Sequence, residues 1–200
     1  MTIPLLEVLI LSPFDASEAR LVRQALSAVD GLQRAYFGRE IEDPSQGYCA
    51  LQWRSLRARD AFLRSAAYDE YTRHISVQRG PFLIALPEEE LEGWTATAGA
   101  PVQKLAFLRA CTPIAREKVH DILALMRSGR EERAAERTTI GEMYAAVVDD
   151  PDCYVIMDGW RSVAEHQAYA ARASNSAALG EIIPVLEWCS SKHATEVLED

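Results

Sequence analysis

The amino-acid sequence predicts two α+β units in tandem, each with the element order β-α-β-β-α-β. Three observations lead to this prediction. Short apolar runs alternate with segments of helical periodicity, this order restarts after residue 101, and the two halves share a short repeat at constant spacing. The chain has 200 residues, 48% hydrophobic and 26% charged, which suits two globular domains of about 100 residues each. We expect a first repeat over 1–90, a linker over 91–101 and a second repeat over 102–200.

The first half opens with an apolar run that ends at Ser12-Pro13, which predicts a strand. Apolar residues then recur at helical spacing until Asp30-Gly31, which is a helix stop signal. The elements expected in this half are a strand over 4–11, a helix capped by Asp15 or Ser17, strands over 32–41 and 48–53, a helix over 55–71, and a strand over 82–86.

The second half repeats this order after an acidic segment that turns rich in Gly, Ala and Thr, which is our linker candidate. The elements expected are strands over 102–111, 143–148, 154–160 and 182–188, with helices over 114–126 and 162–178. Pro184 inside the final run indicates a sheet edge or a bulge, because proline cannot donate to the ladder. The element order β-α-β-β-α-β, present twice, is the ferredoxin-like pattern.

The repeat is visible in the residues themselves. Asp43-Pro44 precedes Trp53-Arg54-Ser55, and Asp150-Pro151 precedes Trp160-Arg161-Ser162, with an offset of 107 in both (from 43 to 150, and from 53 to 160). Ser55 and Ser162 are placed to cap the following helices. Each tryptophan ends a strand, where its indole either packs over the rim of the sheet or contacts a ligand.

The segments QWRSLRARDAFLRS (52–65) and GWRSVAEHQAYAAR (159–172) resemble the dimeric α/β-barrel superfamily, in particular antibiotic-biosynthesis-monooxygenase-like and stress-responsive A/B-barrel domains. The resemblance implies two sheets packed face to face as an α/β barrel, with helices outside and an apolar small molecule inside. Two chains usually supply the halves, and here the duplication could supply both from one chain. A further homodimer stays open.

Composition and motifs exclude several classes of function. The formal net charge of −9 repels polyphosphate, so we expect no nucleic-acid partner. No apolar run is long enough to cross a bilayer, so we expect no membrane partner. The four cysteines and four histidines show no metal-ligand spacing, and no nucleotide-binding motif occurs, so we expect no metal and no cofactor. Reduced cysteines suit a cytoplasmic protein.

The candidate site residues are polar groups within apolar strands, and aromatic groups near them. A buried charge is costly unless it is paired, so such residues either point outward or serve a ligand. His166 lies one turn into the helix expected after Trp160, and its counterpart in the first repeat is Arg59. Our catalytic candidates are Arg109, Asp158 and His166, and our substrate-binding candidates are Tyr36, Tyr144, Trp53 and Trp160.

The resemblance implies a small cofactor-independent enzyme of secondary metabolism, monooxygenase-like, acting on an apolar aromatic or polyketide-like substrate. In such chemistry the substrate carbanion reduces O₂, while the protein supplies a base, a dry cavity and orientation. A cyclase or isomerase would use the same pocket. A non-enzymatic, stress-related small-molecule-binding protein is the third alternative. Haem handling occurs in related folds, but no histidine here has a clear axial-ligand context.

Overall fold

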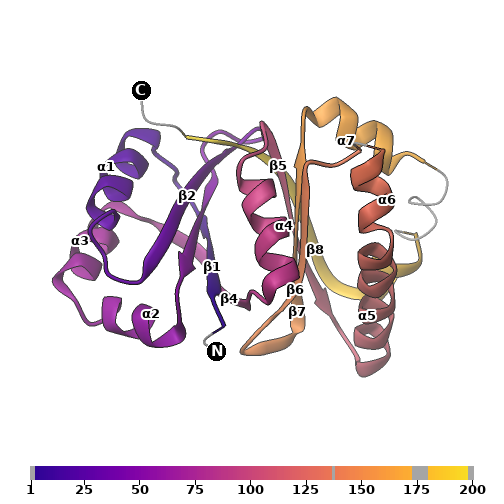
Figure 1. Ribbon diagram of the computed structural model, residues 1–200, viewed down its shortest axis with the longest axis horizontal. Coiled ribbons are helices and arrows are strands. Elements are labelled where there is room, and N and C mark those ends of the chain that lie inside the picture. Colours follow the sequence, from indigo (N-terminus) through magenta and orange to yellow (C-terminus); the bar gives the residue numbers. More distant parts are fainter. Residues whose placement is uncertain (1–2, 137, 173–179, 198–200) are drawn as a thin grey trace. The chain divides into compact units, whose positions relative to one another are not determined.

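The computed structural model describes residues 3–136, 138–172 and 180–197, which form two compact units (Figure 1). Unit 1 runs to Glu88 and takes in the residues from Ala194 onward, while unit 2 covers Glu89–His193. Both are α+β with antiparallel sheets, so the fold class predicted from sequence is confirmed. No helix among the described residues is long and apolar enough to span a membrane. The homodimer stays a prediction.

Unit 1 is built on a four-stranded sheet in the order β4-β1-β3-β2, which is the ferredoxin-like order. Residues 194–196, at the end of the chain's last strand, β8, add a short fifth pairing on β2, with Gly38 opposite Glu196. The elements are β1 Leu5–Leu11, α1 Ala16–Leu26, β2 Leu32–Glu40, β3 Gly47–Trp53, α2 Leu56–Phe62, α3 Ala66–His74 and β4 Val77–Ala85.

The core of unit 1 lies between its helices and one face of the sheet. Alternate residues of the strands, among them Leu9, Phe37 and Cys49, pack there against Val22 of α1 and Tyr71 of α3. Register partners point to the same face of a sheet. This face therefore carries the apolar half of each strand, and the helices cover it.

Unit 2 repeats the strand order as β8-β5-β7-β6. Val119 and Leu123 of α5 pack on Ala106, Tyr144 and Ile156 of the sheet. The elements are α4 Glu88–Ala98, β5 Val102–Ala110, α5 Pro113–Ser128, α6 Arg130–Ala135, β6 Gly141–Val147, β7 Asp150–Trp160, α7 Val163–Ala170, a 3₁₀ turn Ile183–Val185 and β8 Leu186–Glu196.

Two local expectations differ from the structure, and a third lies partly outside the described residues. The helix expected over 55–71 is two helices, because the Ser65 side chain accepts the Tyr68 N–H and starts a new one. The strand expected over 182–188 is wrong at its start. Pro184 lies in the 3₁₀ turn, and the strand begins at Leu186 and runs to Glu196. Part of the helix expected over 162–178 lies outside the described residues.

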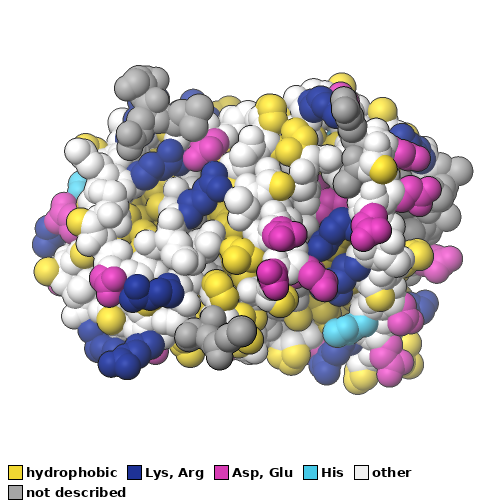
Figure 2. Space-filling model, viewed as in Figure 1, with side chains coloured by type: hydrophobic (Ala, Val, Ile, Leu, Met, Phe, Trp, Pro, Cys, Tyr) yellow, Lys and Arg dark blue, Asp and Glu magenta, His cyan; other side chains and the backbone are white. Residues whose placement is uncertain are grey.

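Most of the segment expected as a linker, 91–101, lies in α4, which packs on the sheet of unit 2. Trp94 of this helix is fully buried. The Glu90 carboxylate accepts the Tyr144 N–H of β6 at 2.9 Å and forms ion pairs with Arg127 and Arg130. Acidic side chains of α4 and α6 gather on the face shown in Figure 2. Glu90 thus satisfies one backbone donor of β6, the end strand of this unit's sheet.

Gly93 allows α4 to approach β6 this closely, because a Cβ at this position would overlap the carbonyl of Glu142. We expect Gly93→Ala to lower the free energy of unfolding by about 1–3 kcal/mol, as overpacking does, despite the better helix propensity of alanine. Urea unfolding measures the change. Gly99→Ala is the matched control, since a Cβ there meets only ordinary contacts. Equal stability of the two variants would contradict this account of α4.

Candidate active site in unit 2

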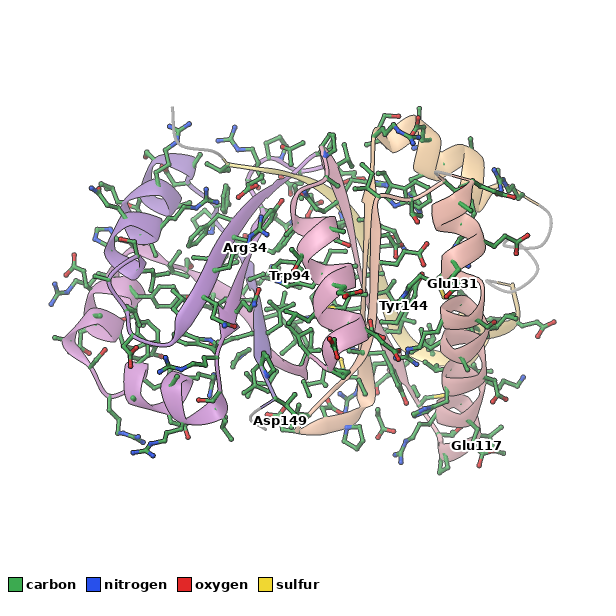
Figure 3. The ribbon with its side chains drawn as sticks, viewed as in Figure 1. Arg34, Trp94, Glu117, Glu131, Tyr144 and Asp149 are labelled. Carbon is green, nitrogen blue, oxygen red and sulfur yellow. The ribbon has the colours of Figure 1, made fainter. Side chains whose placement is uncertain are left out.

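A row of three charged residues crosses the sheet of unit 2. Lys104 of β5 is the register partner of Asp158 of β7, which in turn is the partner of Glu142 of β6. The next row on the same face, Ala106, Ile156 and Tyr144, belongs to the apolar cluster beneath α5. Tyr144 points from β6 to the side that α5 and α6 cover (Figure 3). The charged row therefore lies on the helix-covered face, away from bulk water.

Asp158 is the central residue of this row. It is 4% exposed, and its Oδ2 accepts a hydrogen bond from Lys104 Nζ at 2.9 Å. Its Oδ1 is buried and has no hydrogen-bond partner among the described residues. Burial raises the pKa of Asp158 above its ordinary value, and the Lys104 ammonium opposes this rise. Asp158 is thus a carboxylate with one free acceptor atom and a raised proton affinity.

Glu142, in contrast, has every carboxylate oxygen engaged. It accepts from Arg133 at 2.6 Å, from the Tyr144 hydroxyl at 2.6 Å and from the Thr139 hydroxyl at 2.7 Å. Burial alone would raise the pKa of Glu142, but these hydrogen bonds together hold it below the ordinary value. A carboxylate this fully paired holds the site together and has no free acceptor for a ligand.

Trp160 lies at the end of β7, where α7 begins. Ser162 caps α7 by accepting the Glu165 N–H, so the first turn brings His166 over the indole and the second brings Tyr169. The ring centroids of His166 and Tyr169 lie 4.9 Å and 5.3 Å from that of Trp160. The indole is 2% exposed, and its Nε1–H has no hydrogen-bond partner among the described residues.

One face of β7 therefore carries an acceptor, Asp158 Oδ1, and a donor, Trp160 Nε1–H, that have no hydrogen-bond partner among the described residues. Residues two apart on a strand are about 7 Å apart and point the same way. Buried polar atoms without a partner are rare in proteins, and each requires an explanation. A small molecule with both a hydroxyl or acidic C–H group and a carbonyl oxygen would satisfy the two atoms together.

Unit 1 has the same positions but fills them from its own side chains. Trp53, the counterpart of Trp160, donates its Nε1–H to Glu7 Oε2 at 3.0 Å. The other oxygen of Glu7 pairs with Arg59, the counterpart of His166, at 2.8 Å. Leu51 stands where unit 2 has Asp158. The open donor and acceptor thus occur in unit 2, and their unit 1 counterparts are a satisfied indole and a leucine.

The structure brings four of the predicted site residues together in unit 2: Asp158, Trp160, His166 and Tyr144. Arg109 is placed elsewhere. It lies five residues from Lys104, about 17 Å along β5, and pairs with Asp150 and Glu187. Tyr36 belongs to unit 1, on the sheet face opposite its helices, where its ring stacks on Tyr48 at 5.3 Å.

Sequence reasoning missed Glu142, Arg133 and His193 as members of this cluster. The signal for Glu142 was present, since it is a charged residue next to the apolar strand over 143–148. Arg133 lies in α6, which was not expected. His193 lies in β8 beyond the predicted end of that strand, and its ring is 4.8 Å from that of His166.

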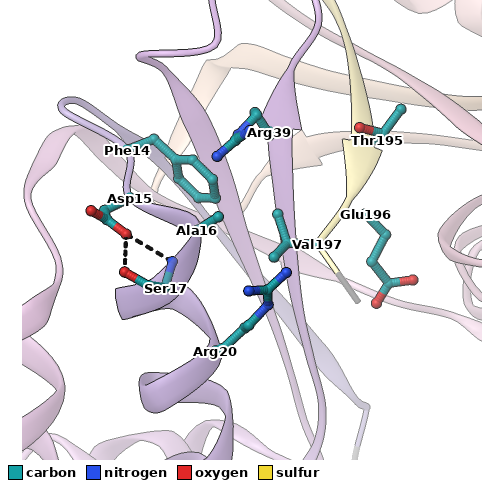
Figure 4. Close-up of a pocket in the computed structure, with 9 residues that line it drawn as sticks. All are labelled: Phe14, Asp15, Ala16, Ser17, Arg20, Arg39, Thr195, Glu196 and Val197. Carbon is teal, nitrogen blue, oxygen red and sulfur yellow. Dashed lines mark hydrogen bonds between the residues drawn. The ribbon is translucent and has the colours of Figure 1, made fainter. Parts of the chain in front are cut away.

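Two surface grooves lie outside this cluster. The groove in Figure 4, about 610 Å³, lies in unit 1 between the start of α1 and the residues from Thr195. Asp15 already caps that helix, and Glu196 is paired with Arg23, so both carboxylates of this groove are engaged. The second groove, about 280 Å³, is lined by Tyr169 in unit 2. Since Tyr169 also stacks on Trp160, this groove adjoins the buried indole.

Several solved structures have the same architecture as this chain. A putative monooxygenase from Fusobacterium nucleatum superposes with a TM-score of 0.69 at 7% identity, covering 98% of this chain and 94% of that one. A Listeria monocytogenes ferredoxin-fold protein related to antibiotic biosynthesis monooxygenases gives 0.60 at 7%, covering 100% and 97%. The chain has the ferredoxin-like fold of these monooxygenase-related proteins.

An anthrone oxidase-like protein shares this ferredoxin-like fold, with a TM-score of 0.60 at 12% identity over 98% of this chain and 92% of that one. No family model and no curated protein sequence matches the chain. The likeness to these proteins is therefore one of fold, and any assignment of a reaction depends on the residues of unit 2.

Proposed function

We propose that unit 2 is a monooxygenase-like active site for an apolar aromatic or polyketide-like substrate that carries a carbonyl next to an acidic C–H bond. One observation carries this proposal: Asp158 Oδ1 and Trp160 Nε1–H, from residues two apart on β7, are both buried without a hydrogen-bond partner among the described residues. The fold shared with monooxygenase-related proteins supports the reaction class. We also propose that this reaction belongs to secondary metabolism.

The proposed reaction converts a methylene group to a carbonyl: R₂CH₂ and O₂ give R₂C=O and H₂O. Asp158 takes the first proton, and the Trp160 N–H stabilises the negative charge that develops on the substrate carbonyl oxygen. The carbanion transfers its electrons to O₂, and a C–O bond forms as a hydroperoxide. Asp158 returns its proton to the peroxide oxygen and so completes the hydroperoxide. His166 then takes the second C–H proton as the C=O bond forms and the O–O bond breaks, and it passes this proton to the departing hydroxide, which leaves as water.

A matched pair of tryptophan variants tests the site. We expect Trp160→Phe to weaken substrate binding and lower kcat/KM by about 10²-fold, because it removes a donor aimed at developing charge. Trp53→Phe is expected to leave kcat/KM unchanged, since its N–H is held by Glu7. Oxygen uptake and product mass with an anthrone, using metal-stripped protein, are the readouts. Equal effects of both changes, or a product of unchanged mass, would overturn the monooxygenase proposal.

The pH profile follows from the raised pKa of Asp158. A general base works only when it is deprotonated, so kcat/KM is expected to fall as the pH drops through this raised pKa. Burial is the main cause of the rise. The acid limb is therefore expected above the range of an ordinary aspartate, near 3.9. A stopped-flow measurement of oxygen consumption between pH 4 and 9 gives the profile, and a limb at or below pH 4 would remove Asp158 from the role of base.

A further inference from the structure

Lys104 of unit 2 and Glu7 of unit 1 occupy the same place in their sheets. Each follows by two residues the register partner of the tryptophan that ends β7 or β3. Residues two apart on a strand point to the same face, which here is the face that the helices cover. The register partner of Lys104 is Asp158, and that of Glu7 is Leu51. One register pair therefore differs between two otherwise equivalent places.

The side chains of Glu7 and Lys104 differ in what they offer to the neighbouring indole. A carboxylate accepts hydrogen bonds, and Glu7 Oε2 accepts the Trp53 Nε1–H at 3.0 Å. An ammonium group has three donors and no acceptor, so Lys104 is unable to accept from Trp160. The Trp160 Nε1–H is buried without a hydrogen-bond partner among the described residues. The exchange of Glu for Lys at this place accounts for the difference between the two indoles.

The Lys104 ammonium also acts on the residue opposite it. Its Nζ donates to Asp158 Oδ2 at 2.9 Å, and both side chains are largely buried. A buried carboxylate is costly without such a partner, whereas Leu51, at the equivalent place in unit 1, needs none. Lys104 thus makes a buried aspartate tolerable and engages one of its oxygens. The other oxygen, Oδ1, has no partner among the described residues.

We propose that Lys104 is the positioning residue that gives unit 2, and not unit 1, its substrate site. It holds Asp158 by Oδ2, which leaves Oδ1 to take the substrate proton, and it leaves the Trp160 N–H for the substrate carbonyl. This inference rests on the proposed function of unit 2. Unit 1 carries Glu7 at the same place, and this carboxylate occupies the indole donor that a substrate would need.

Giving unit 2 the register pair of unit 1 tests the inference without any substrate. A hydrogen bond to a carboxylate moves the proton signal of an indole N–H downfield. We expect this shift for Trp160 in the double variant Lys104→Glu/Asp158→Leu, read from ¹H–¹⁵N spectra that Trp160→Phe assigns. The matched control is Lys104→Met/Asp158→Leu, which brings no acceptor and is expected to leave the Trp160 signal near its original position. Coinciding signals in the two double variants would overturn the proposal.

Single variants at Lys104 keep Asp158 and give a second readout that needs no double variant to fold. Lys104→Met and Lys104→Gln both remove the charge, but only glutamine brings an acceptor, at the chain length with which Glu7 reaches its indole. We expect the Trp160 signal downfield in the glutamine variant alone. At the pH optimum of each variant, kcat/KM is expected to be about 10²-fold lower for glutamine than for methionine, because the indole donor is then occupied.

Lys104→Arg is the conservative variant, because a guanidinium also has donors and no acceptor. It is expected to keep the Trp160 signal in place and to retain most of kcat/KM. Equal kcat/KM for the arginine and glutamine variants would contradict the role given to Lys104. The expected Trp160 signals in a protein that takes up no oxygen would instead contradict the proposed function and leave this inference intact.

Discussion

Replacing Lys104 with Met and Asp158 with Leu in one variant is expected to leave unit 2 folded while lowering turnover by about 10²–10⁴-fold. The change removes the proposed base together with its ion-pair partner. Leucine is the residue that unit 1 carries at the position of Asp158. Replacing a buried ion pair by apolar groups of similar volume is often neutral, or stabilising by about 1–4 kcal/mol. Loss of activity and retention of stability are therefore expected together.

The single variant Asp158→Leu separates the two effects. It leaves the Lys104 ammonium, 14% exposed, without its partner, so we expect a loss of about 3–5 kcal/mol in the free energy of unfolding. Urea unfolding of the single and double variants, with oxygen uptake on the same samples, measures both quantities. A double variant that turns over substrate at the normal rate would remove Asp158 from the mechanism.

The second large effect is expected in unit 1, on stability alone. Arg59→Met leaves the Glu7 carboxylate buried without its guanidinium partner, and we expect a loss of about 3–5 kcal/mol. Adding Glu7→Gln to this variant should recover part of the loss, because no buried charge then remains and the amide oxygen can still accept from Trp53. Thermal and urea unfolding measure the changes.

Turnover at a temperature where both Arg59 variants stay folded is expected to equal that of the unmodified chain, since the proposed site lies in unit 2. A fall in kcat with unchanged stability would show that the Glu7–Arg59 pair takes part in the chemistry. Titration of the protein with substrate measures how many molecules bind per chain, and we expect one. Two would mean that unit 1 also binds.

The sequence was most informative where one physical signal dominated. The repeat at an offset of 107 aligned Trp53 with Trp160 and predicted two units of the same element order. It was less informative where two signals compete. Ser65 within an apolar helical pattern is both a tolerable interior residue and a strong cap, and the chain uses it as a cap. The segment from 87 to 101, acidic at its start, indicated a linker, yet Trp94 of that segment is buried.

The candidate site shows the same limit. Asp158 and His166 could be found from the sequence, because a charge in an apolar strand and an asymmetry between repeats are both visible there. Which polar atoms of the site have hydrogen-bond partners could not be predicted from the sequence. In unit 1, for example, Glu7 accepts a hydrogen bond from Trp53, which lies 46 residues away in the chain. Such pairing depends on register and side-chain direction, which no local pattern encodes.

The membership of residues 194–197 in unit 1 has a consequence for how the chain folds during synthesis. Arg23 and Glu196, which form an ion pair, are 173 residues apart in sequence. The ribosome releases the strands of unit 1 early, but the backbone groups along the open side of β2 have no partner from this segment until it emerges. An unpaired strand edge of this kind is prone to wrong pairing while it waits. Unit 1 is therefore expected to depend on chaperones, or on slow translation, more than its size alone would suggest.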